Sequence, residues 1–265
     1  MNKNNIFDLH GKNILLTGAS GLLGQAYAEG LSRQGANVIL ADINYNKCKL
    51  LEISIRKKYP VNPFAIKVDL TKKDSILKML VKIQKKIPTI DILINNAMYH
   101  EGEKEQNTTF EQFPLSSWNK VISVNLTGMF LLCQEIGKLM KKQKKGVIIN
   151  VSSIYGLVGA DQRIYENSGI NSSVAYATTK SAVLNFTRYL ASYWHKDGIR
   201  VNSISLGGVE NNQNPNFIKN YSHKTMMRRM AKKEEYVGAM IFLCSDASSY
   251  MTGSNLIVDG GWTAW

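Results

Sequence analysis

The sequence NILLTGASGLLG at residues 13–24 determines how the rest of the chain can fold. Its first five residues form a short apolar run, which is typical of a buried parallel strand. Gly18, Gly21 and Gly24 come next, and a helix-like apolar pattern then runs as far as Gly35. A strand, a glycine-rich turn and a helix in this order place free backbone N–H groups where a phosphate can approach. The segment therefore predicts a dinucleotide site, with a merely tight turn as the alternative.

An acidic residue ends the next predicted strand. The apolar residues 37–41 run into Asp42, and Ile43 follows. A carboxylate about 20 residues beyond such glycines accepts hydrogen bonds from the adenosine ribose, and it would repel a 2′-phosphate. The glycine turn contains no Lys or Arg. We therefore expect NAD rather than NADP, while a helix-capping role for Asp42 is compatible with this one.

Strand-like and helix-like patterns alternate along the whole chain. Further apolar runs that predict strands lie at residues 64–68, 91–97, 146–151, 199–204 and 255–259. This alternation predicts an α/β, Rossmann-like, doubly wound fold with a seven-stranded, mainly parallel sheet and helices on both faces. A length of 265 residues fits one domain, residues 1–265. Residues 98–117 are predicted to form a surface loop, and the polar residues 207–231 a mobile lid on the substrate side.

Composition limits the possible partners. The net charge is +13, but the basic residues are dispersed over several predicted helices, which favours solvated faces over a nucleic-acid site. No run approaches the about 20 apolar residues of a membrane span. Three scattered cysteines and four histidines form no metal-ligand pattern, and we expect a cytoplasmic protein without a metal.

Tyr176 and Lys180 are the candidate catalytic pair. Four residues apart on a helix, they share one face, where an ammonium would favour the phenolate form of a general base. The spacing alone is weak evidence, because Tyr45 and Lys49 have it too. Ser153, with Ser152 before it, follows the strand at 146–151, at the edge of the sheet where ligands bind in open α/β folds.

In their order along the chain, these motifs resemble the single-domain short-chain dehydrogenase/reductase family over essentially the whole sequence. The matching residues are Thr17, Gly18, Gly24, Asp42, Asp69, Asn95, Asn96, Ala97, Asn125, Ser153, Tyr176, Lys180, Tyr250–Gly253 and Val258–Gly261.

The resemblance implies a role for each catalytic residue. Tyr176 would be the acid/base, and Ser153 would hold the substrate oxygen. Lys180 would bind the nicotinamide ribose and lower the pKa of Tyr176, and Asn125 would hold a water that relays the proton. We prefer Ser153 to Ser152 because its spacing to Gly156 matches the family.

The resemblance also implies a set of cofactor contacts and an oligomer. Family members are commonly tetramers, so we expect a homotetramer or homodimer formed by helices at 125–140 and 176–193, with Trp262 and Trp265 able to join another contact. The expected NAD-binding residues are Gly18, Ser20, Gly21, Leu22, Leu23, Gly24, Asp42, Ile43, Asp69, Leu70, Asn96, Ala97, Tyr176, Lys180, Gly207 and Val209.

Three features depart from the family pattern. The family usually has its middle glycine at the position of Leu22, whereas this chain has it one residue earlier, at Gly21. This spacing is more typical of a branch that includes sugar epimerases and dehydratases. Leu206 replaces a usual proline, which predicts a less rigid turn. The interval from Ser153 to Tyr176 is longer than usual by about ten residues, as a compact loop could supply.

This longer interval predicts a substrate-side insertion at residues 157–175. Tyr155, Arg163 and Tyr165 are, with Ser153, the candidate substrate residues, and a solvated loop is the alternative. The Ser-Ser-Ile-Tyr-Gly motif, the insertion and the Asp-Gly-Gly-Trp ending resemble a subgroup linked to bacterial surface-polysaccharide and flagellin-modification sugars.

These observations favour an NAD(H)-dependent oxidoreductase that interconverts a secondary alcohol and a ketone on a sugar, sugar-phosphate or nucleotide-sugar derivative. An NAD-retaining sugar epimerase or dehydratase is one alternative, because of the glycine spacing. A non-catalytic NAD(H) sensor is another, although it would have no need of the Tyr176 base.

Overall fold

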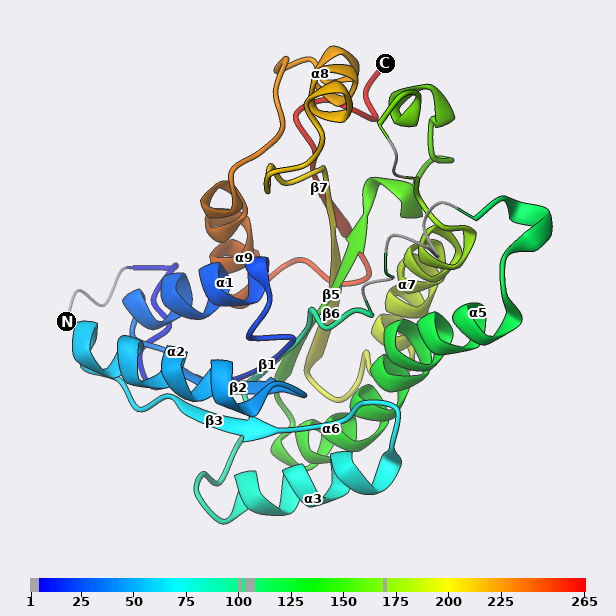
Figure 1. Ribbon diagram of the computed structural model, residues 1–265. Coiled ribbons are helices and arrows are strands. Elements are labelled where there is room, and N and C mark those ends of the chain that lie inside the picture. The colour runs from blue at the N-terminus through cyan, green and yellow to red at the C-terminus, as the bar shows by residue number, and fades with distance from the viewer. Residues whose placement is uncertain (1–4, 100–101, 103–107, 169–170) are drawn as a thin grey trace.

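Seven parallel strands form the centre of the molecule. The computed structural model describes residues 5–99, 102, 108–168 and 171–265. Within them the strand order is β3-β2-β1-β4-β5-β6-β7, and every pairing is parallel (Figure 1). The strands are β1 Asn13–Thr17, β2 Asn37–Asp42, β3 Phe64–Lys67, β4 Ile92–Asn95, β5 Gly146–Ser153, β6 Ile199–Leu206 and β7 Asn255–Val258. The predicted Rossmann-like sheet is therefore confirmed.

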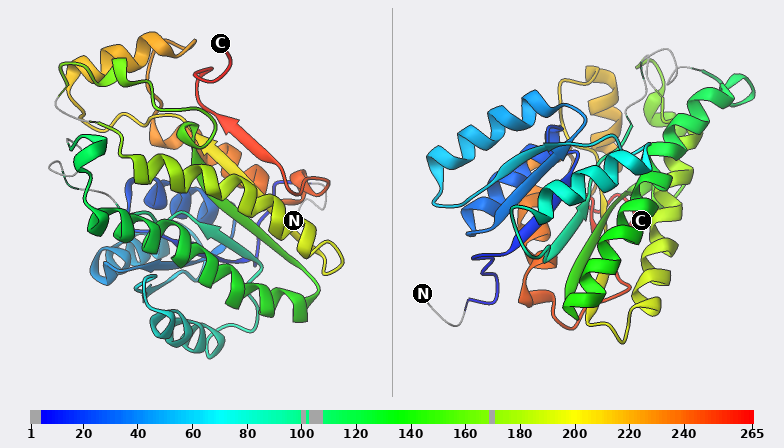
Figure 2. Two further views of the ribbon diagram at one scale, coloured as in Figure 1. Left: turned by 90° about the vertical axis from the view of Figure 1, so that its right-hand side faces the viewer. Right: turned by 90° about the horizontal axis from the view of Figure 1, so that it is seen from below.

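Helices cover both faces of the sheet, as Figure 2 shows from two further directions. Side chains alternate along a strand, so Leu15 of β1 belongs to one buried cluster and Leu16 to the other. The Leu16 side is covered by α1 Leu22–Arg33, α2 Tyr45–Lys58 and α9 Val237–Cys244, and the Leu15 side by α3 Lys73–Gln84, α6 Met129–Gln143 and α7 Val174–Tyr193. These two cores fix the carboxyl ends of the strands along one edge.

A π-helical turn joins two helices near that edge. Helix α5, Leu115–Ile122, passes through the turn Ser123–Gly128 directly into α6. Asn125 lies inside the turn. A π-helical turn contains one residue more than an α-helical turn, and this gives the Asn125 side chain room to bond outside its own helix.

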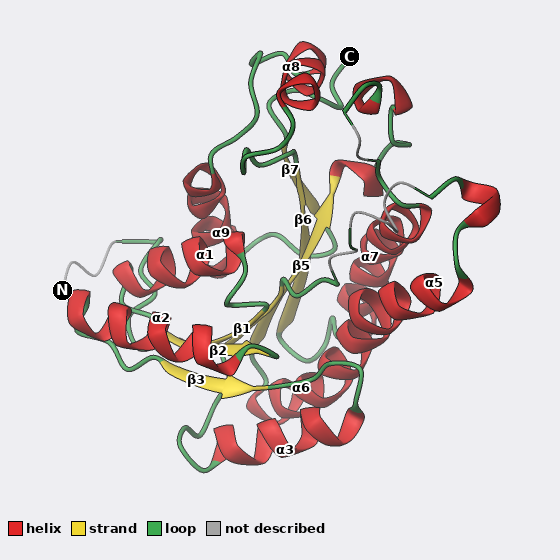
Figure 3. Cartoon of the chain, in the orientation of Figure 1, coloured by secondary structure: helices red, strands yellow, loops and turns green. Residues whose placement is uncertain are grey.

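Two predicted loops contain helices. Residues 98–117 include a 3₁₀ turn, Phe110–Gln112, and the start of α5, while the predicted lid includes α8, Pro215–Lys224. Helix α8 has Pro215 in its first turn and is capped by Asn214, whose side chain accepts from the backbone of Asn216. Its apolar pattern is too sparse for a sequence argument, because it buries few residues. Figure 3 shows α8 beyond the carboxyl ends of the strands, next to the C-terminus.

Candidate active site

Tyr176 and Lys180 lie on the first turns of α7, which packs against β5. The Ser173 side chain caps this helix by accepting the backbone N–H of Tyr176 at 3.0 Å. Lys180 is 4% exposed; its ammonium donates to the Val151 carbonyl at 2.8 Å and lies 5.7 Å from the centre of the Tyr176 ring. The predicted pair therefore shares one helix face at the carboxyl end of β5.

Burial favours the neutral form of both groups and shifts the pKa of each accordingly. It lowers the pKa of Lys180 to about 8. Burial also raises the pKa of Tyr176, while a hydrogen bond from Ser153 to its phenol lowers it. Burial is thus the larger influence on the pKa of Tyr176 in the chain alone, and the expected lowering by Lys180 stays a prediction.

The two serines after β5 have different partners. Ser152 Oγ donates to the Lys180 carbonyl at 2.7 Å, which fastens α7 to the strand. Ser153 Oγ accepts the Tyr155 N–H at 3.2 Å and hydrogen-bonds Tyr176. A Cβ on Gly156 would lie 2.6 Å from both the Lys180 carbonyl oxygen and Ser152 Oγ, so only glycine allows this approach. Geometry supports the choice of Ser153 over Ser152.

Asn125 connects the segment after β4 to α7. Its side-chain oxygen accepts the Tyr99 N–H at 2.7 Å, and its amide donates to Thr179 Oγ1 at 3.4 Å. The side chain is buried, and both its oxygen and its nitrogen have a partner. Asn125 therefore positions the helix that carries Tyr176; the expected relay water stays a prediction. Neither Tyr99 nor Thr179 carried a sequence signal, because both partners are distant in the chain.

The glycine turn has the shape that a phosphate site needs. Gly18 has φ +65°, and a Cβ there would lie 2.7 Å from Ala97 Cα, so this position accepts only glycine. A Cβ on Gly24 would lie 2.1 Å from the Gly18 carbonyl oxygen. Gly21 precedes Leu22, the first residue of α1, and no side chain caps the helix. The α1 N–H groups, from Leu22 and Leu23 onward, are thus left without a side-chain acceptor, and the shifted middle glycine still closes a tight turn.

The expected cofactor residues gather around this turn. The Asn96 amide donates to the carbonyls of Thr17 and Gly18, at 3.0 and 3.2 Å. Asp42 accepts the backbone N–H groups of Ser20 and Asn44, at 3.0 and 2.8 Å, and thereby joins the end of β2 to the turn. The exposed Ile43 follows it.

Asp69 and Leu70 follow β3 at the same edge of the sheet. The Asp69 carboxylate accepts from the N–H and hydroxyl of Thr71, and these bonds lower its pKa. Leu70 is buried against the π-helical turn, where a Cβ on Gly128 would lie 2.8 Å from Leu70 Cβ. That Asp69 and Leu70 contact the cofactor stays a prediction.

The turn after β6 is fastened by two tyrosines. Tyr236 donates to the Gly207 carbonyl at 2.9 Å, and Tyr221 of α8 accepts the Gly208 N–H. Val209 pairs with Ala231 in an isolated bridge. These contacts hold the turn although Leu206 stands in place of proline, and the sequence had not indicated either tyrosine.

Tyr155, which precedes the insertion, and Tyr165, within it, lie together near Tyr176, whereas Arg163 does not. The Tyr155 and Tyr165 hydroxyl oxygens are 2.5 Å apart, and the Tyr155 ring is edge-on to Tyr176. Arg163 is 77% exposed and bonds the carboxylate of Asp161 through two nitrogens, each at 2.8 Å. The prediction that Arg163 is a substrate residue therefore has no support in its surroundings.

The two C-terminal tryptophans, which the sequence analysis expected to be able to join a subunit contact, differ in exposure. Trp262 is 3% exposed, because its ring stacks on Tyr221 with the centres 4.4 Å apart. Trp265 is exposed and donates to the Lys224 carbonyl at 2.9 Å. The proposal that Trp262 joins a subunit contact is wrong, since the chain buries this ring itself.

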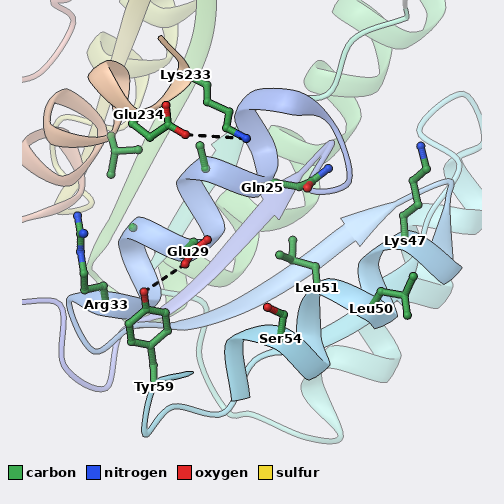
Figure 4. Close-up of a pocket in the computed structure, with 13 residues that line it drawn as sticks. Gln25, Glu29, Arg33, Lys47, Leu50, Leu51, Ser54, Tyr59, Lys233 and Glu234 are labelled. Atoms are coloured by element: carbon green, nitrogen blue, oxygen red, sulfur yellow. Dashed lines mark hydrogen bonds and ion pairs between the residues drawn. The ribbon is translucent and has the colours of Figure 1, made fainter. Parts of the chain in front are cut away.

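A cavity of about 690 Å³ lies elsewhere, between α1, α2 and the segment before α9 (Figure 4). Leu50 and Leu51 line it beside the paired Glu29–Tyr59 and Lys233–Glu234. None of the catalytic candidates lines this cavity, and it belongs to the sheet face opposite α7. Among the residues that the structure describes, no cluster of His, Cys, Asp or Glu could hold a metal, and no helix is long and apolar enough to cross a membrane.

Comparison with known proteins identifies the family. Residues 18–263 match the family model described as enoyl-(acyl carrier protein) reductase. The post-translational flagellin modification protein A of Campylobacter coli is 30% identical over 254 residues, which cover 96% of this chain and 99% of that protein. An NAD-dependent glycerol dehydrogenase of Listeria innocua is 34% identical over 97% of this chain and 96% of its own length.

Solved structures agree in fold over nearly the whole chain. A short-chain dehydrogenase from Leptospira borgpetersenii with bound NAD+ is 37% identical, with a TM-score of 0.85 over 99% of this chain and 97% of its own. A gluconate 5-dehydrogenase from Burkholderia cenocepacia in complex with NADP and tartrate is 27% identical, with a TM-score of 0.87 over 98% of each chain. With the glycine turn and the Ser153, Tyr176 and Lys180 arrangement, these matches show that the chain belongs to the single-domain short-chain dehydrogenases/reductases.

Proposed function

We propose that this protein is an NAD(H)-dependent oxidoreductase that interconverts a secondary alcohol and a ketone, with Tyr176 as the acid/base. The observation that carries the proposal is the convergence of Tyr176, Ser153 and Lys180 at the carboxyl end of β5. Their hydroxyl and ammonium groups are held by backbone contacts and by one another. Such a set can hold a substrate oxygen and exchange its proton.

The residues fit a nicotinamide dinucleotide. A side chain at Gly18 or Gly24 would fill the turn, and the N-terminus of α1 lacks a capping side chain. When bound, the cofactor supplies the hydride acceptor or donor. Its phosphates would lie against the glycine turn, at Gly18, Ser20, Gly21, Leu22, Leu23 and Gly24. The adenosine ribose would contact Asp42 and Ile43, and the adenine would contact Asp69, Leu70, Asn96 and Ala97. The nicotinamide half would contact Lys180, Gly207 and Val209.

The proton chemistry belongs to Tyr176. Its phenol would accept the alcohol proton during oxidation and return it during reduction, with Ser153 donating to the substrate oxygen. Burial opposes the phenolate, so a nearby positive charge must offset that penalty. Lys180 lies on the same helix face, and the oxidised nicotinamide ring adds a second positive charge.

We propose NAD over NADP because of Asp42. Its carboxylate lies beside the turn and would repel a 2′-phosphate. The Leptospira relative was solved with NAD+, whereas the Burkholderia one holds NADP, so the family contains both preferences.

For the substrate we propose a sugar derivative used in surface-glycan or flagellin modification. Support comes from relatives named for flagellin modification, glycerol and 5-keto-D-gluconate. We also propose a homotetramer or homodimer through α6 and α7. These helices expose Phe130, Tyr189 and Tyr193, and a groove of about 450 Å³ lies between them.

The test is NADH formation by the purified protein on a panel of polyols, sugars, sugar phosphates and nucleotide sugars, with NAD and NADP in parallel. We expect turnover with NAD on a carbohydrate alcohol. A preference for NADP would overturn the role of Asp42. Conversion of a sugar without net formation of NADH, by protein that keeps NAD tightly bound, would instead favour the epimerase or dehydratase alternative.

A further inference from the structure

Five aromatic side chains from four separate segments form what we call the aromatic roof: Tyr155, Tyr165, Phe217, Tyr221 and Trp262. They come from the end of β5, the insertion, α8 and the C-terminal tail. In Figures 1 and 2 these segments lie together beyond the carboxyl ends of β5–β7. The roof is therefore on the side of the sheet edge where the Tyr176 phenol works.

The roof extends from Tyr176 through ring contacts and through one hydrogen bond, between the Tyr155 and Tyr165 hydroxyls. The Tyr155 ring stands at 90° to Tyr176 with the centres 6.4 Å apart, and Tyr165 stacks on Phe217 at 5.5 Å. Phe217 then contacts Tyr221 at 5.8 Å, and Tyr221 stacks on Trp262 at 4.4 Å. The Tyr165 ring thus contacts the outer part of the roof by stacking on Phe217, and this contact does not involve the Tyr165 hydroxyl.

The hydroxyls at the inner end of the roof are not fully used. Tyr155 and Tyr165 share one hydrogen bond, which uses one of their two protons. Ser172 Oγ is buried nearby and has no hydrogen-bond partner among the described residues. Burial raises the pKa of Tyr165 to about 12, and the hydrogen bond with Tyr155 lowers it. One tyrosine proton and one serine hydroxyl are thus available to a ligand, and buried polar groups are rarely left so.

The inner end of the roof is also uncharged. Its groups are phenols and the Ser172 hydroxyl, while three basic residues in the surrounding segments are paired with carboxylates. Arg163 and Lys224 share the Asp161 carboxylate, and Arg229 bonds Glu235. An anionic substrate group would therefore find no free cation among these side chains.

We propose that the Tyr155–Tyr165 hydroxyl pair binds a second, neutral hydroxyl of the substrate, next to the carbon that reacts at Tyr176. The substrate class is then an uncharged polyol or ketose at its reacting end, with vicinal oxygens, rather than a simple secondary alcohol. This inference rests on the proposed oxidoreductase function and adds the determinant of its specificity.

The test compares two secondary alcohols that differ by one vicinal hydroxyl, 1,2-propanediol and 2-propanol, as probes with saturating NAD. We expect the wild type to favour the diol in kcat/KM. Tyr165→Phe keeps the ring on Phe217 and removes the hydroxyl, so it should lower kcat/KM for the diol about tenfold and leave 2-propanol nearly unchanged. Tyr155→Phe should do the same. Tyr250→Phe, the same change at a fully exposed tyrosine, is the matched control and should change neither value.

The possible outcomes distinguish this inference from the proposed oxidoreductase function on which it rests. An equal loss on both alcohols in Tyr165→Phe would mean that the pair only supports the fold, and the inference would be wrong. Failure of the wild type to prefer the diol, with Tyr176-dependent turnover of an anionic substrate, would also refute it while the proposed function stands. Absence of Tyr176-dependent turnover on every substrate would refute the proposed function itself.

Discussion

Lys180 shows how a single buried charge links the site to stability. Its ammonium is almost wholly enclosed by α7 and β5, and burial lowers its pKa to about 8 from an ordinary 10.5. Between these values the unfolded chain holds a proton that the folded chain has released. The free energy of unfolding should therefore rise as the pH goes from about 8 to 10.5, by at most about 3 kcal/mol from this group.

Lys180→Met should remove this pH dependence. In the absence of cofactor we expect the variant to be the more stable protein at pH 7, with the difference shrinking as the pH approaches 10.5. Denaturant unfolding of both proteins across this range measures the effect, because the other titrating groups cancel in the difference. A stability difference that stays constant with pH would contradict the assigned environment of Lys180.

Two buried tyrosines on the opposite sheet face form a natural pair for comparison. Tyr27 Oη is buried without a hydrogen-bond partner among the described residues, whereas Tyr236 Oη bonds the Gly207 carbonyl. Tyr27→Phe should be neutral or stabilising, and Tyr236→Phe should lower the free energy of unfolding by about 1–3 kcal/mol, since it leaves a carbonyl unpaired. Equal losses in thermal or denaturant unfolding would show that Tyr27 has a partner after all.

At the scale of elements, the contact between α1 and α9 depends on a glycine. A Cβ on Gly30 would lie 2.2 Å from Val237 Cγ1, so α9 packs where a larger residue cannot fit. This packing places the start of α9, and with it Tyr236, against the turn after β6.

Gly30→Ala should therefore destabilise the fold by about 1–3 kcal/mol. Adding Val237→Ala should restore part of the loss, because it removes the methyl groups in the way. Gly238→Ala is the matched control, since a Cβ there meets nothing within 4 Å and alanine favours a helix. If the double variant is no more stable than Gly30→Ala in denaturant unfolding, the close approach is not the cause.

The elements also show what the sequence could reveal. Strands such as 13–17 and 199–204 were recognisable because buried parallel strands are continuous apolar runs. Helix α8 was not, because it buries little more than Phe217 and Tyr221 and contacts the insertion through long-range stacking. The glycine turn, Asp42 and the Ser153, Tyr176 and Lys180 set lie in local motifs, so the sequence alone could propose them as site residues.

At the scale of the whole molecule, the sequence alone could not predict which residues contact the site residues and their supports. Tyr99 for Asn125, Tyr221 for Gly208 and Trp262 for Tyr221 meet only after the chain has folded. The same folding carried Arg163 into an ion pair with Asp161 rather than toward Tyr176. Local chemistry predicts the catalytic residues, while their supports depend on tertiary packing.

The central proposal for the whole molecule is that Tyr176 transfers the substrate proton. The most direct measurement is kcat for alcohol oxidation in Tyr176→Phe, with NAD+ affinity determined separately, and with Tyr45→Phe as control because Tyr45 and Lys49 repeat the same spacing on α2. We expect kcat to fall about 10²–10⁴-fold in Tyr176→Phe at nearly unchanged NAD+ affinity, and to stay unchanged in Tyr45→Phe. Turnover by Tyr176→Phe at the wild-type rate would contradict the assignment of Tyr176 as the acid/base.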